Sequence, residues 1–335
     1  MSESQAAVRW GVVADSSSIS SPIRVELCAA EEKLLRLLDS NEALIGEICH
    51  YLVDGGGKRL RPTFILLAYR ACGGSDVKID DAIDAAIALE LIHSATLLHD
   101  DIIDGGKLRR GKPSAYARYG SAASLVAGDY LFCRAFELCG RFEERLVHTA
   151  ARACIQLTEG EVMEGRMRNR ADANLDDYIA IITRKTASLF SAGGRVAADL
   201  AGAGPETIGN MGCLGNAIGL AFQMVDDLLD ILGPEEKIGK PVGSDLRLGV
   251  MSLPVVLGLH SNPELQTLFG NGDCLEGQVL DRVLNILREP QLIARGRAMA
   301  AQHVATARDL LMRLPPSVYR DSLALLIEEQ INRDL

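Results

Sequence analysis

Residues 93–104 read His-Ser-Ala-Thr-Leu-Leu-His-Asp-Asp-Ile-Ile-Asp, and residues 223–230 read Gln-Met-Val-Asp-Asp-Leu-Leu-Asp. Each stretch ends in Asp-Asp-x-x-Asp and lies in a largely apolar segment without proline, which predicts helix. On a helix, the first and last aspartates of each cluster share one face. Carboxylates in apolar surroundings are costly unless they are paired or bind a cation, so the two clusters predict sites for hard cations. The candidate metal ligands are Asp100, Asp101, Asp104, Asp226, Asp227 and Asp230.

The composition predicts an all-α protein. The 335 residues are 48% hydrophobic but only 4% aromatic, and alanine and leucine are abundant, which favours helix over sheet. Residues 1–22 are expected to form a flexible tail, and residues 23–335 a single domain. Helical spacing is found at residues 24–52, 63–72, 80–104, 120–140, 144–169, 175–202 and 206–232, with shorter helices expected over 253–335.

Charge and cysteine usage argue against several classes of protein. A net charge of −10 gives no electrostatic support for a nucleic-acid partner. No run of about 18 apolar residues is uninterrupted, so no transmembrane segment is expected. The N-terminus lacks the basic and apolar regions of a secretory signal, and the eight cysteines form no C-x-x-C pair. These features predict a cytoplasmic protein with reduced thiols.

Basic residues are concentrated in three short segments despite the negative net charge. These segments are 55–62 (GGGKRLRP), 107–112 (KLRRGK) and 184–190 (RKTASLF). Arginine and lysine bind phosphate oxygens, and adjacent glycines let the backbone adapt to a ligand. The first segment does not have the spacing of a P-loop. Each segment alone could equally be a solvated charged turn, but beside two acidic clusters they favour a site for metal-bound phosphate.

The chain resembles the trans-type isoprenyl diphosphate synthases of the polyprenyl synthetase family, from about residue 25 to its end. Each matching motif is weak alone, but their order and spacing together are specific. The motifs are GGGKRLRP (55–62), HSATLLHDDIIDGGKLRRGKP (93–113), GDYLF (128–132), EGE (159–161), RKTASLF (184–190), FQMVDDLLD (222–230) and GKPVGSDL (239–246). The resemblance implies a helical bundle of the isoprenoid synthase type around a deep central cavity.

The resemblance also implies roles for individual residues. The outer aspartates of the first cluster would bind Mg²⁺ ions that bridge the allylic diphosphate, and Asp226 would bind a third ion directly. Contacts to the allylic diphosphate are matched by Arg109, Lys185 and Lys240. The isopentenyl diphosphate pocket is matched by Lys58, Arg61, His93 and Arg110. Thr186 and Gln223 match groups that line the reacting carbons.

The implied reaction is a head-to-tail condensation of isopentenyl diphosphate with an allylic diphosphate. The departing diphosphate would be neutralised by basic residues and three Mg²⁺ ions. Ionisation of the C–O bond leaves an allylic carbocation, which the double bond of isopentenyl diphosphate attacks before a proton is lost. Oxygens of Thr186 and Gln223 would stabilise the cation, and the released diphosphate would take the proton. The resemblance further implies a homodimer packed through residues 115–140.

Product length is predicted from the helix before the first cluster. The growing chain is expected to run along this helix away from Asp100. Ala95 and Thr96 lie five and four positions before Asp100, and the small Ala95 leaves open a path that an aromatic residue would close. Each further turn, beginning at Ile92, adds about 5.4 Å, close to one isoprene unit. With Met163 as a candidate floor, we expect a product of heptaprenyl or octaprenyl length, and a geranylgeranyl or farnesyl product is the alternative.

One position departs from the family pattern. The family's usual lysine, ten positions past Lys240, is Val250 here, which puts one diphosphate contact in doubt. Two other functions stay open at this point. A class I terpene cyclase would share one acidic cluster but would have little need for a basic pocket at Lys58 and Arg61. A non-catalytic partner subunit of a heteromeric synthase should lack the acidic clusters, which are intact.

Overall fold

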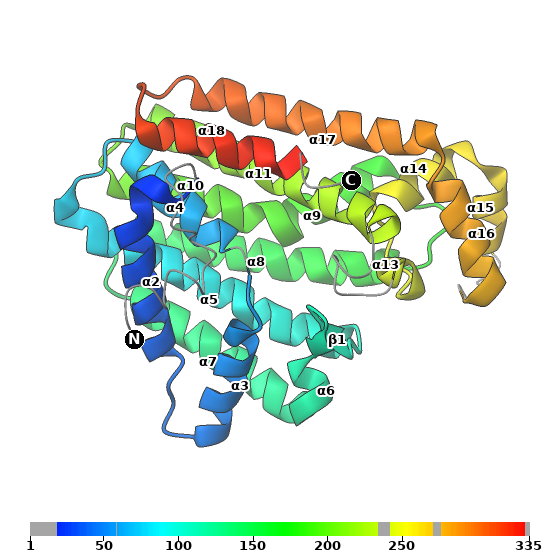
Figure 1. The fold of residues 1–335 in the computed structure, drawn as a ribbon, viewed down its shortest axis with the longest axis horizontal. Coiled ribbons are helices and arrows are strands. Elements are labelled where there is room, and N and C mark those ends of the chain that lie inside the picture. The colour runs from blue at the N-terminus through cyan, green and yellow to red at the C-terminus, as the bar shows by residue number, and fades with distance from the viewer. Residues whose placement is uncertain (1–18, 58, 234–241, 271–275, 332–335) are drawn as a thin grey trace. The chain divides into compact units, whose positions relative to one another are not determined.

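The computed structural model describes residues 19–57, 59–233, 242–270 and 276–331. Helices make up nearly all of the regular structure, as Figure 1 shows, and the all-α prediction is confirmed. By its internal contacts the chain divides into two compact units. Unit 1 comprises residues 1–151, 192–213 and 310–326, and unit 2 comprises residues 152–191, 214–309 and 327–335. The expected single domain over residues 23–335 stays a prediction.

The elements of the first half of the chain are α2 (Arg24–Leu37), α3 (Ala43–Asp54), α4 (Leu60–Ala71), α5 (Ile79–Ile103), β1 (Leu108–Arg109), β2 (Lys112–Pro113), α6 (Ala115–Tyr119), α7 (Ser121–Cys139) and α8 (Glu144–Met167). Those of the second half are α9 (Leu175–Ile182), a π-helical turn (Thr183–Ala187), α10 (Ser188–Leu200), α11 (Pro205–Leu232), α13 (Ser244–Arg247), α14 (Leu253–Ser261), α15 (Pro263–Gly270), α16 (Gly277–Leu287), α17 (Pro290–Leu311) and α18 (Val318–Ile331).

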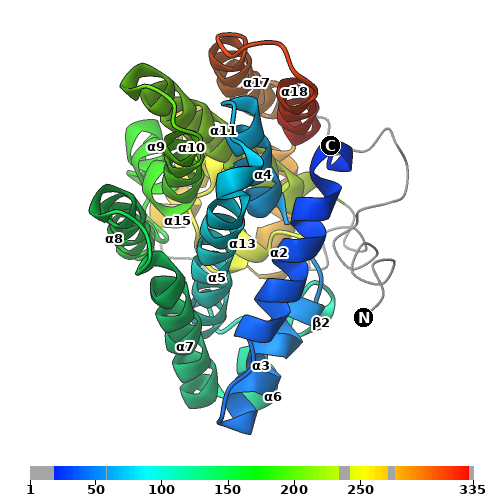
Figure 2. The ribbon, with the colours of Figure 1, turned by 90° about the vertical axis from the view of Figure 1, so that its left-hand side faces the viewer.

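Helix α5 forms the core of unit 1. It contains neither glycine nor proline, and Asp80 and Asp81 in its first turn suit the positive end of the helix dipole. Helices α2, α4 and α7 all contact it, and Figure 2 shows α7 beside α5. Apolar residues surround its axis, as expected of a helix that is covered on all sides. Among the described residues α5, with the short turn before it, is also the only segment long and apolar enough to cross a membrane, and 78% of that window is buried inside the protein.

The end of α5 leads into a two-stranded hairpin that the sequence did not reveal. The helix ends at the acidic cluster, as predicted, and Asp104 is its C-cap. Strands β1 and β2 then pair antiparallel, with Arg109 opposite Lys112. The two residues between them, Arg110 (φ 53°) and Gly111 (φ 73°), are both left-handed, which is the geometry that tight hairpins require. The hairpin therefore carries Arg109 and Arg110 at the end of α5.

Two helix predictions are wrong in detail. The helix expected over residues 24–52 is divided into α2 and α3, because the chain turns at residues 38–42, where the Ser40 hydroxyl accepts a hydrogen bond from the Glu42 amide at 3.2 Å. The helix expected over residues 175–202 is interrupted by the π-helical turn. Side chains that hydrogen-bond nearby backbone compete with helix, and sequence periodicity does not detect them.

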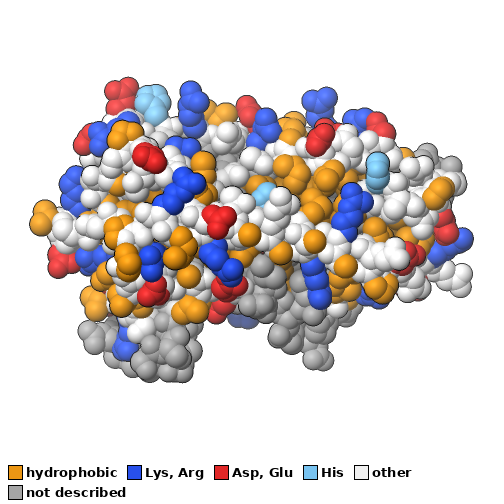
Figure 3. All heavy atoms as spheres, turned by 90° about the horizontal axis from the view of Figure 1, so that it is seen from above, with side chains coloured by type: hydrophobic (Ala, Val, Ile, Leu, Met, Phe, Trp, Pro, Cys, Tyr) orange, Lys and Arg blue, Asp and Glu red, His pale blue; other side chains and the backbone are white. Residues whose placement is uncertain are grey.

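Unit 2 is built around the short apolar helix α14. Residues 253–259 of this helix are all buried. Helices α9, α15 and α16 contact it, and α14, α15 and α16 lie close together in Figure 1. The start of α14 thereby reaches the second acidic cluster, as the hydrogen bonds below show. On the face of the molecule in Figure 3, acidic and basic side chains are interspersed with hydrophobic ones.

Helix α11 offers two glycines whose substitution tests the tight packing in unit 2. A Cβ at Gly215 would collide with the carbonyl oxygen of Phe190, whereas nothing lies within 4 Å of one at Gly209. We expect Gly215→Ala to lower the free energy of unfolding by about 1–3 kcal/mol. The matched Gly209→Ala should raise it by up to about 1 kcal/mol, because alanine is the better helix former. Denaturant unfolding measures both, and equal effects would contradict the close approach.

Candidate active site

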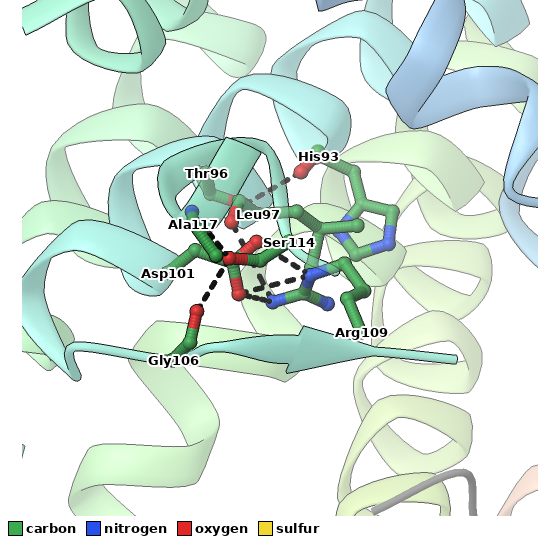
Figure 4. Close-up of polar contacts among 8 residues, drawn as sticks. All are labelled: His93, Thr96, Leu97, Asp101, Gly106, Arg109, Ser114 and Ala117. Atoms are coloured by element: carbon green, nitrogen blue, oxygen red, sulfur yellow. Dashed lines mark hydrogen bonds and ion pairs between the residues drawn. The ribbon is translucent and has the colours of Figure 1, made fainter. Parts of the chain in front are cut away.

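In the first cluster, Asp101 forms a hydrogen-bonded ion pair with Arg109. The Arg109 Nε donates to the two Asp101 oxygens at 3.1 and 2.9 Å, and Nη2 donates to Oδ1 at 2.8 Å (Figure 4). Nη2 also reaches the Leu97 carbonyl at 3.5 Å. The Asp101 side chain is only 5% exposed. Its oxygens orient the arginine here, whereas Asp100 and Asp104 are half-buried, and the prediction of Asp101 as a metal ligand stays a prediction.

Ser114 holds the hairpin at the end of α5. Its hydroxyl donates to the Gly106 carbonyl and accepts from the Ala117 amide at 3.0 Å, so it also caps α6 (Figure 4). Its own amide donates to the Lys107 carbonyl at 2.9 Å. These contacts fix the hairpin, and so the backbone of Arg109, relative to the acidic cluster.

The glycine-rich segment is anchored by an arginine for which the sequence reading proposed no role. Arg59 donates to the Val53 carbonyl at 3.1 Å and to Glu90 Oε1 of α5 at 3.3 Å. Both side chains of the Arg59–Glu90 pair are buried, at 7% and 5% exposure. The backbone of Arg59 is left-handed (φ 44°), which is uncommon for arginine and is held in place by these contacts. Nothing in the spacing of the three cations indicated that this one turns inward.

His93 lies on α5 amid the basic residues. Burial lowers its pKa well below the usual range, and so do the charges of nearby guanidinium groups. The groups responsible are Arg61, Arg109, Arg110 and Arg59. The imidazole is therefore neutral near pH 7 and can donate one hydrogen bond and accept another. The structure thus brings Arg61, His93 and Arg110 into one electrostatic cluster, and their role in binding isopentenyl diphosphate stays a prediction.

Arg110 packs on the glycine-rich segment. A Cβ at Gly57 would lie 3.0 Å from both terminal nitrogens of the Arg110 guanidinium, so this position needs a glycine. Burial lowers the pKa of Arg110, as do Arg59 and Arg109, while Glu90 raises it. Crowded cations of this kind stabilise an anion placed among them. Lys58, predicted for the same pocket, lies outside the described residues.

The residues proposed to set product length occupy two different elements. Ile92 and Ala95 are fully covered on α5, and the Thr96 hydroxyl donates to the His93 carbonyl at 2.8 Å (Figure 4). Met163 lies on α8, where it lines an apolar pocket of about 660 Å³ together with Ile155 and Val162. The path of a growing chain past these residues stays a prediction.

In the second cluster, Asp227 is buried and saturated by hydrogen bonds. Its Oδ2 accepts from the Tyr178 hydroxyl at 2.8 Å and from the Leu253 amide at 2.9 Å, and its Oδ1 accepts from Gln223 Nε2 at 2.9 Å. Burial raises the pKa of Asp227 to about 7, although these hydrogen bonds act to lower it. The protein's own donors thus contact both oxygens of Asp227, and its role as a metal ligand stays a prediction.

Asp230 and Asp226 differ in their surroundings. Asp230 is 7% exposed, accepts from the Ser244 hydroxyl at 2.7 Å and from the Asp245 amide at 3.3 Å, and so ties α11 to the first turn of α13. Asp226 is half-buried. Asp230 is thus the more deeply buried of the two, and the roles of Asp226 and Asp230 as metal ligands stay predictions.

Lys185 is held by two carboxylates of α8. Its ammonium lies 2.7 Å from Glu161 Oε2 and 2.6 Å from Glu164 Oε1. Gly160 permits this approach, since a Cβ there would lie 2.6 Å from the Lys185 amide nitrogen. Glu164 was missed in the sequence, although its spacing of three from Glu161 places both on one helix face. Lys240 lies outside the described residues, and Val250 closes the turn after α13 by donating to the Asp245 carbonyl at 2.9 Å.

The donor set fits magnesium bound together with a phosphate ligand. Within the described ranges, no three side chains of His, Cys, Asp or Glu converge as a ready metal cage. Mg²⁺ is usually held by one or two carboxylates, with waters and phosphate oxygens completing its shell. In unit 1, Asp100 and Asp104 at the end of α5 are carboxylates of this kind, and in unit 2 so is Asp226 on α11.

Comparison with known proteins decides the family. Residues 42–287 match the family model described as polyprenyl synthetase. The chain belongs to the polyprenyl synthetase family. It is thus a prenyl diphosphate synthase by family, with the isoprenoid synthase fold.

Two curated relatives and one solved structure illustrate the range of this family. The chain is 34% identical over 299 residues to heptaprenyl diphosphate synthase component 2 of Geobacillus stearothermophilus, covering 89% of this chain and 92% of the relative. It is also 34% identical over 294 residues to a short chain isoprenyl diphosphate synthase of Methanothermobacter thermautotrophicus, covering 85% and 89%. A Caulobacter crescentus polyprenyl synthase, solved with calcium and isoprenyl diphosphate, matches with a TM-score of 0.89 at 31% identity, covering 95% and 97%. Long- and short-chain relatives therefore match equally well.

The neutral state of His93 predicts a pH dependence of stability. Unfolded histidine binds a proton below about pH 6.5, whereas folded His93 does not until a much lower pH. We therefore expect the free energy of unfolding to fall as the pH drops below about 6.5, by up to about 1.4 kcal/mol per pH unit from this residue. His93→Asn should remove this contribution, and His148→Asn, at an exposed histidine of α8, should keep the wild-type slope. Unfolding curves from pH 7.5 to 5.5 measure it, and parallel slopes for wild type and His93→Asn would contradict a neutral His93.

Proposed function

We propose that the protein is a Mg²⁺-dependent prenyltransferase that condenses isopentenyl diphosphate with an allylic diphosphate, such as geranyl or farnesyl diphosphate, and releases diphosphate. The observation that carries this proposal is the end of α5, where Asp100 and Asp104 accompany an arginine that Asp101 holds in a fork. Carboxylates for a metal beside a fixed guanidinium suit a diphosphate. The matching Caulobacter structure, which contains calcium and isoprenyl diphosphate, supports the same ligand class.

Two groups of residues would bind the two diphosphates. Arg109, Lys185 and Lys240 would hold the allylic substrate, and Lys58, Arg61, His93 and Arg110 would hold isopentenyl diphosphate. Asp100, Asp104 and Asp226 would hold three Mg²⁺ ions, as the family motifs imply. These ions would neutralise charge on the leaving diphosphate. Arg109 donates to the same oxygens from a geometry that Asp101 has already fixed, so little reorganisation is needed.

The other residues act through position and charge. Lys185 would exchange its two glutamate partners for diphosphate oxygens, which are stronger acceptors for its ammonium. Neutral His93 donates a hydrogen bond without adding to the crowded positive charge around it. Oxygens of Thr186 and Gln223 would face the allylic cation after the C–O bond breaks. The isopentenyl double bond then forms the new C–C bond, and the proton lost goes to the released diphosphate.

We further propose a long-chain product, of heptaprenyl or octaprenyl length, because none of Ile92, Ala95 and Thr96, which precede Asp100 on α5, is aromatic.

We propose a cytoplasmic homodimer packed through α7. The exposed apolar residues Leu125, Val126 and Phe136 of this helix (48%, 51% and 48% exposed) support that interface. A second candidate is one subunit of a heteromeric synthase, favoured by the name of the relative from Geobacillus stearothermophilus, a component 2.

The activity test uses isopentenyl diphosphate with geranyl, farnesyl or geranylgeranyl diphosphate and measures diphosphate release and elongated products. We expect magnesium-dependent elongation by the wild type and a loss of about a hundredfold or more in Asp100→Ala, because a ligand at the leaving group is removed. Asp80→Ala, at an exposed acid in the first turn of the same helix, should retain activity. No elongated product with any of the three primers would sink the proposal.

Product length is tested by Ala95→Phe. Ala95 is fully covered on α5, and in the proposed path of the growing chain a phenyl group there would block elongation. We expect the products to shorten by several isoprene units in reversed-phase chromatography of the dephosphorylated alcohols. The same substitution at Ala305, an exposed position on α17, should leave the length unchanged. An unchanged distribution in Ala95→Phe would show that the chain does not grow along α5.

A further inference from the structure

A continuous chain of hydrogen bonds runs through unit 2 from a buried tyrosine to Thr186. Tyr178 of α9 and the Leu253 amide at the start of α14 donate to one oxygen of Asp227, at 2.8 and 2.9 Å. Gln223, one turn earlier on α11, donates to the other oxygen at 2.9 Å. The Thr186 hydroxyl in the π-helical turn donates to Gln223 Oε1 at 2.7 Å. Three elements of unit 2 and the start of α14 thus meet in one network.

The chemistry of the groups fixes the direction of this chain. A backbone amide can only donate, and an ionised carboxylate can only accept, so Asp227 receives all three of its hydrogen bonds. Gln223 must then turn its NH₂ group toward Asp227, since its carbonyl would be repelled there, and its carbonyl is left for Thr186. The Thr186 hydroxyl must therefore give its proton to Gln223. Its oxygen keeps its lone pairs for another partner.

The packing around this chain leaves little freedom to rearrange. Tyr178 is 2% exposed, and Asp227 and Thr186 are 4% and 7% exposed. A Cβ at Gly219 would lie 2.6 Å from the Ala187 Cα, so α11 and the π-helical turn are in close backbone contact beside Thr186. Single π-helical turns are often found where a protein places functional groups. The turn and the glycine together hold the Thr186 hydroxyl against Gln223.

We propose that Tyr178, Asp227 and Gln223 are a directional relay that presents the oxygen of Thr186, and not its proton, to the allylic cation. This rests on the proposed function, which places Thr186 at the reacting carbons. A hydroxyl dipole with its negative end toward developing positive charge stabilises it, and the reverse orientation opposes it. Tyr178 and Asp227 are then positioning residues of the reaction, and Asp227 serves this orientation while Asp226 serves the metal.

Asp227→Asn tests the relay because it reverses the direction while keeping the number of hydrogen bonds. The Asn oxygen must accept from Tyr178 and Leu253, so its NH₂ faces Gln223, which flips and donates to Thr186. The Thr186 proton is then displaced toward the substrate. At pH 8 we expect kcat to fall about tenfold or more, with KM for both substrates within about twofold and the thermal midpoint unchanged or raised.

A double-mutant cycle with Thr186→Val separates this role from the alternatives. If Asp227 acts through Thr186, adding Asp227→Asn to Thr186→Val should change kcat by less than about twofold. If Asp227 were instead a metal ligand, Asp227→Asn would lower activity equally in both backgrounds, and more Mg²⁺ would be needed for half-activation. The substitution would also weaken Mg²⁺ binding, measured calorimetrically in the presence of a non-reactive diphosphate analogue. Either result would overturn the relay.

Tyr178→Phe provides the second variant, because it removes one donor without changing shape. We expect a several-fold loss in kcat that also disappears in the Thr186→Val background. Tyr69→Phe is the matched control. Tyr69 is a buried tyrosine of unit 1 whose hydroxyl donates one hydrogen bond, to the Ser75 carbonyl at 2.6 Å. The kcat of the Tyr69→Phe variant should stay at the wild-type value. Equal losses in Tyr178→Phe and Tyr69→Phe would show a merely structural role. If the wild type is active and Asp227→Asn has the same kcat, only the relay is overturned. If the wild type is inactive, the proposed function is overturned and the relay with it.

Discussion

The burial of carboxylates is the constraint on which both acidic clusters depend. In each Asp-Asp-x-x-Asp motif the second aspartate is almost fully covered, at 4% exposure for both Asp101 and Asp227. A buried charge without partners costs several kcal/mol, so each must be matched by donors in fixed positions. The guanidinium of Arg109 satisfies Asp101, and three neutral donors satisfy Asp227. The middle aspartates thus organise their surroundings, whereas the first aspartate of each cluster is only half-buried.

The basic half of the site follows the same logic with the opposite sign. Arg59 donates hydrogen bonds to Glu90 and to the Val53 carbonyl, and these bonds hold the glycine-rich segment against α5. Burial and the charges of the nearby guanidinium groups keep His93 neutral. An anion that enters such a cluster lowers its electrostatic energy, because it reduces the repulsion among the cations. Burial, not net charge, therefore concentrates positive potential in a chain whose total charge is −10.

Close backbone approach is what places the remaining functional groups. Gly160 brings α8 against the π-helical turn so that two glutamates reach Lys185, and Gly219 brings α11 against the same turn beside Thr186. Side chains larger than hydrogen would separate these elements by more than a hydrogen bond can span. The π-helical turn is thus held from two sides, and two of its polar residues, Lys185 and Thr186, contact different partners.

The helical class, the ends of most long helices and the acidic and basic motifs could be predicted from the sequence, because apolar periodicity and residue type are local properties. The sequence did not reveal the hairpin after α5, the left-handed Arg59 or the π-helical turn. It also did not reveal which aspartate of each cluster is buried and contacts donors of the protein itself. Those depend on partners such as Arg109, Tyr178 and the Leu253 amide, whose positions follow only from how α5, α9, α11 and α14 pack. Tertiary structure decided them because a hydrogen bond or ion pair forms between groups that the chain brings together, and no spacing along the sequence encodes that distance.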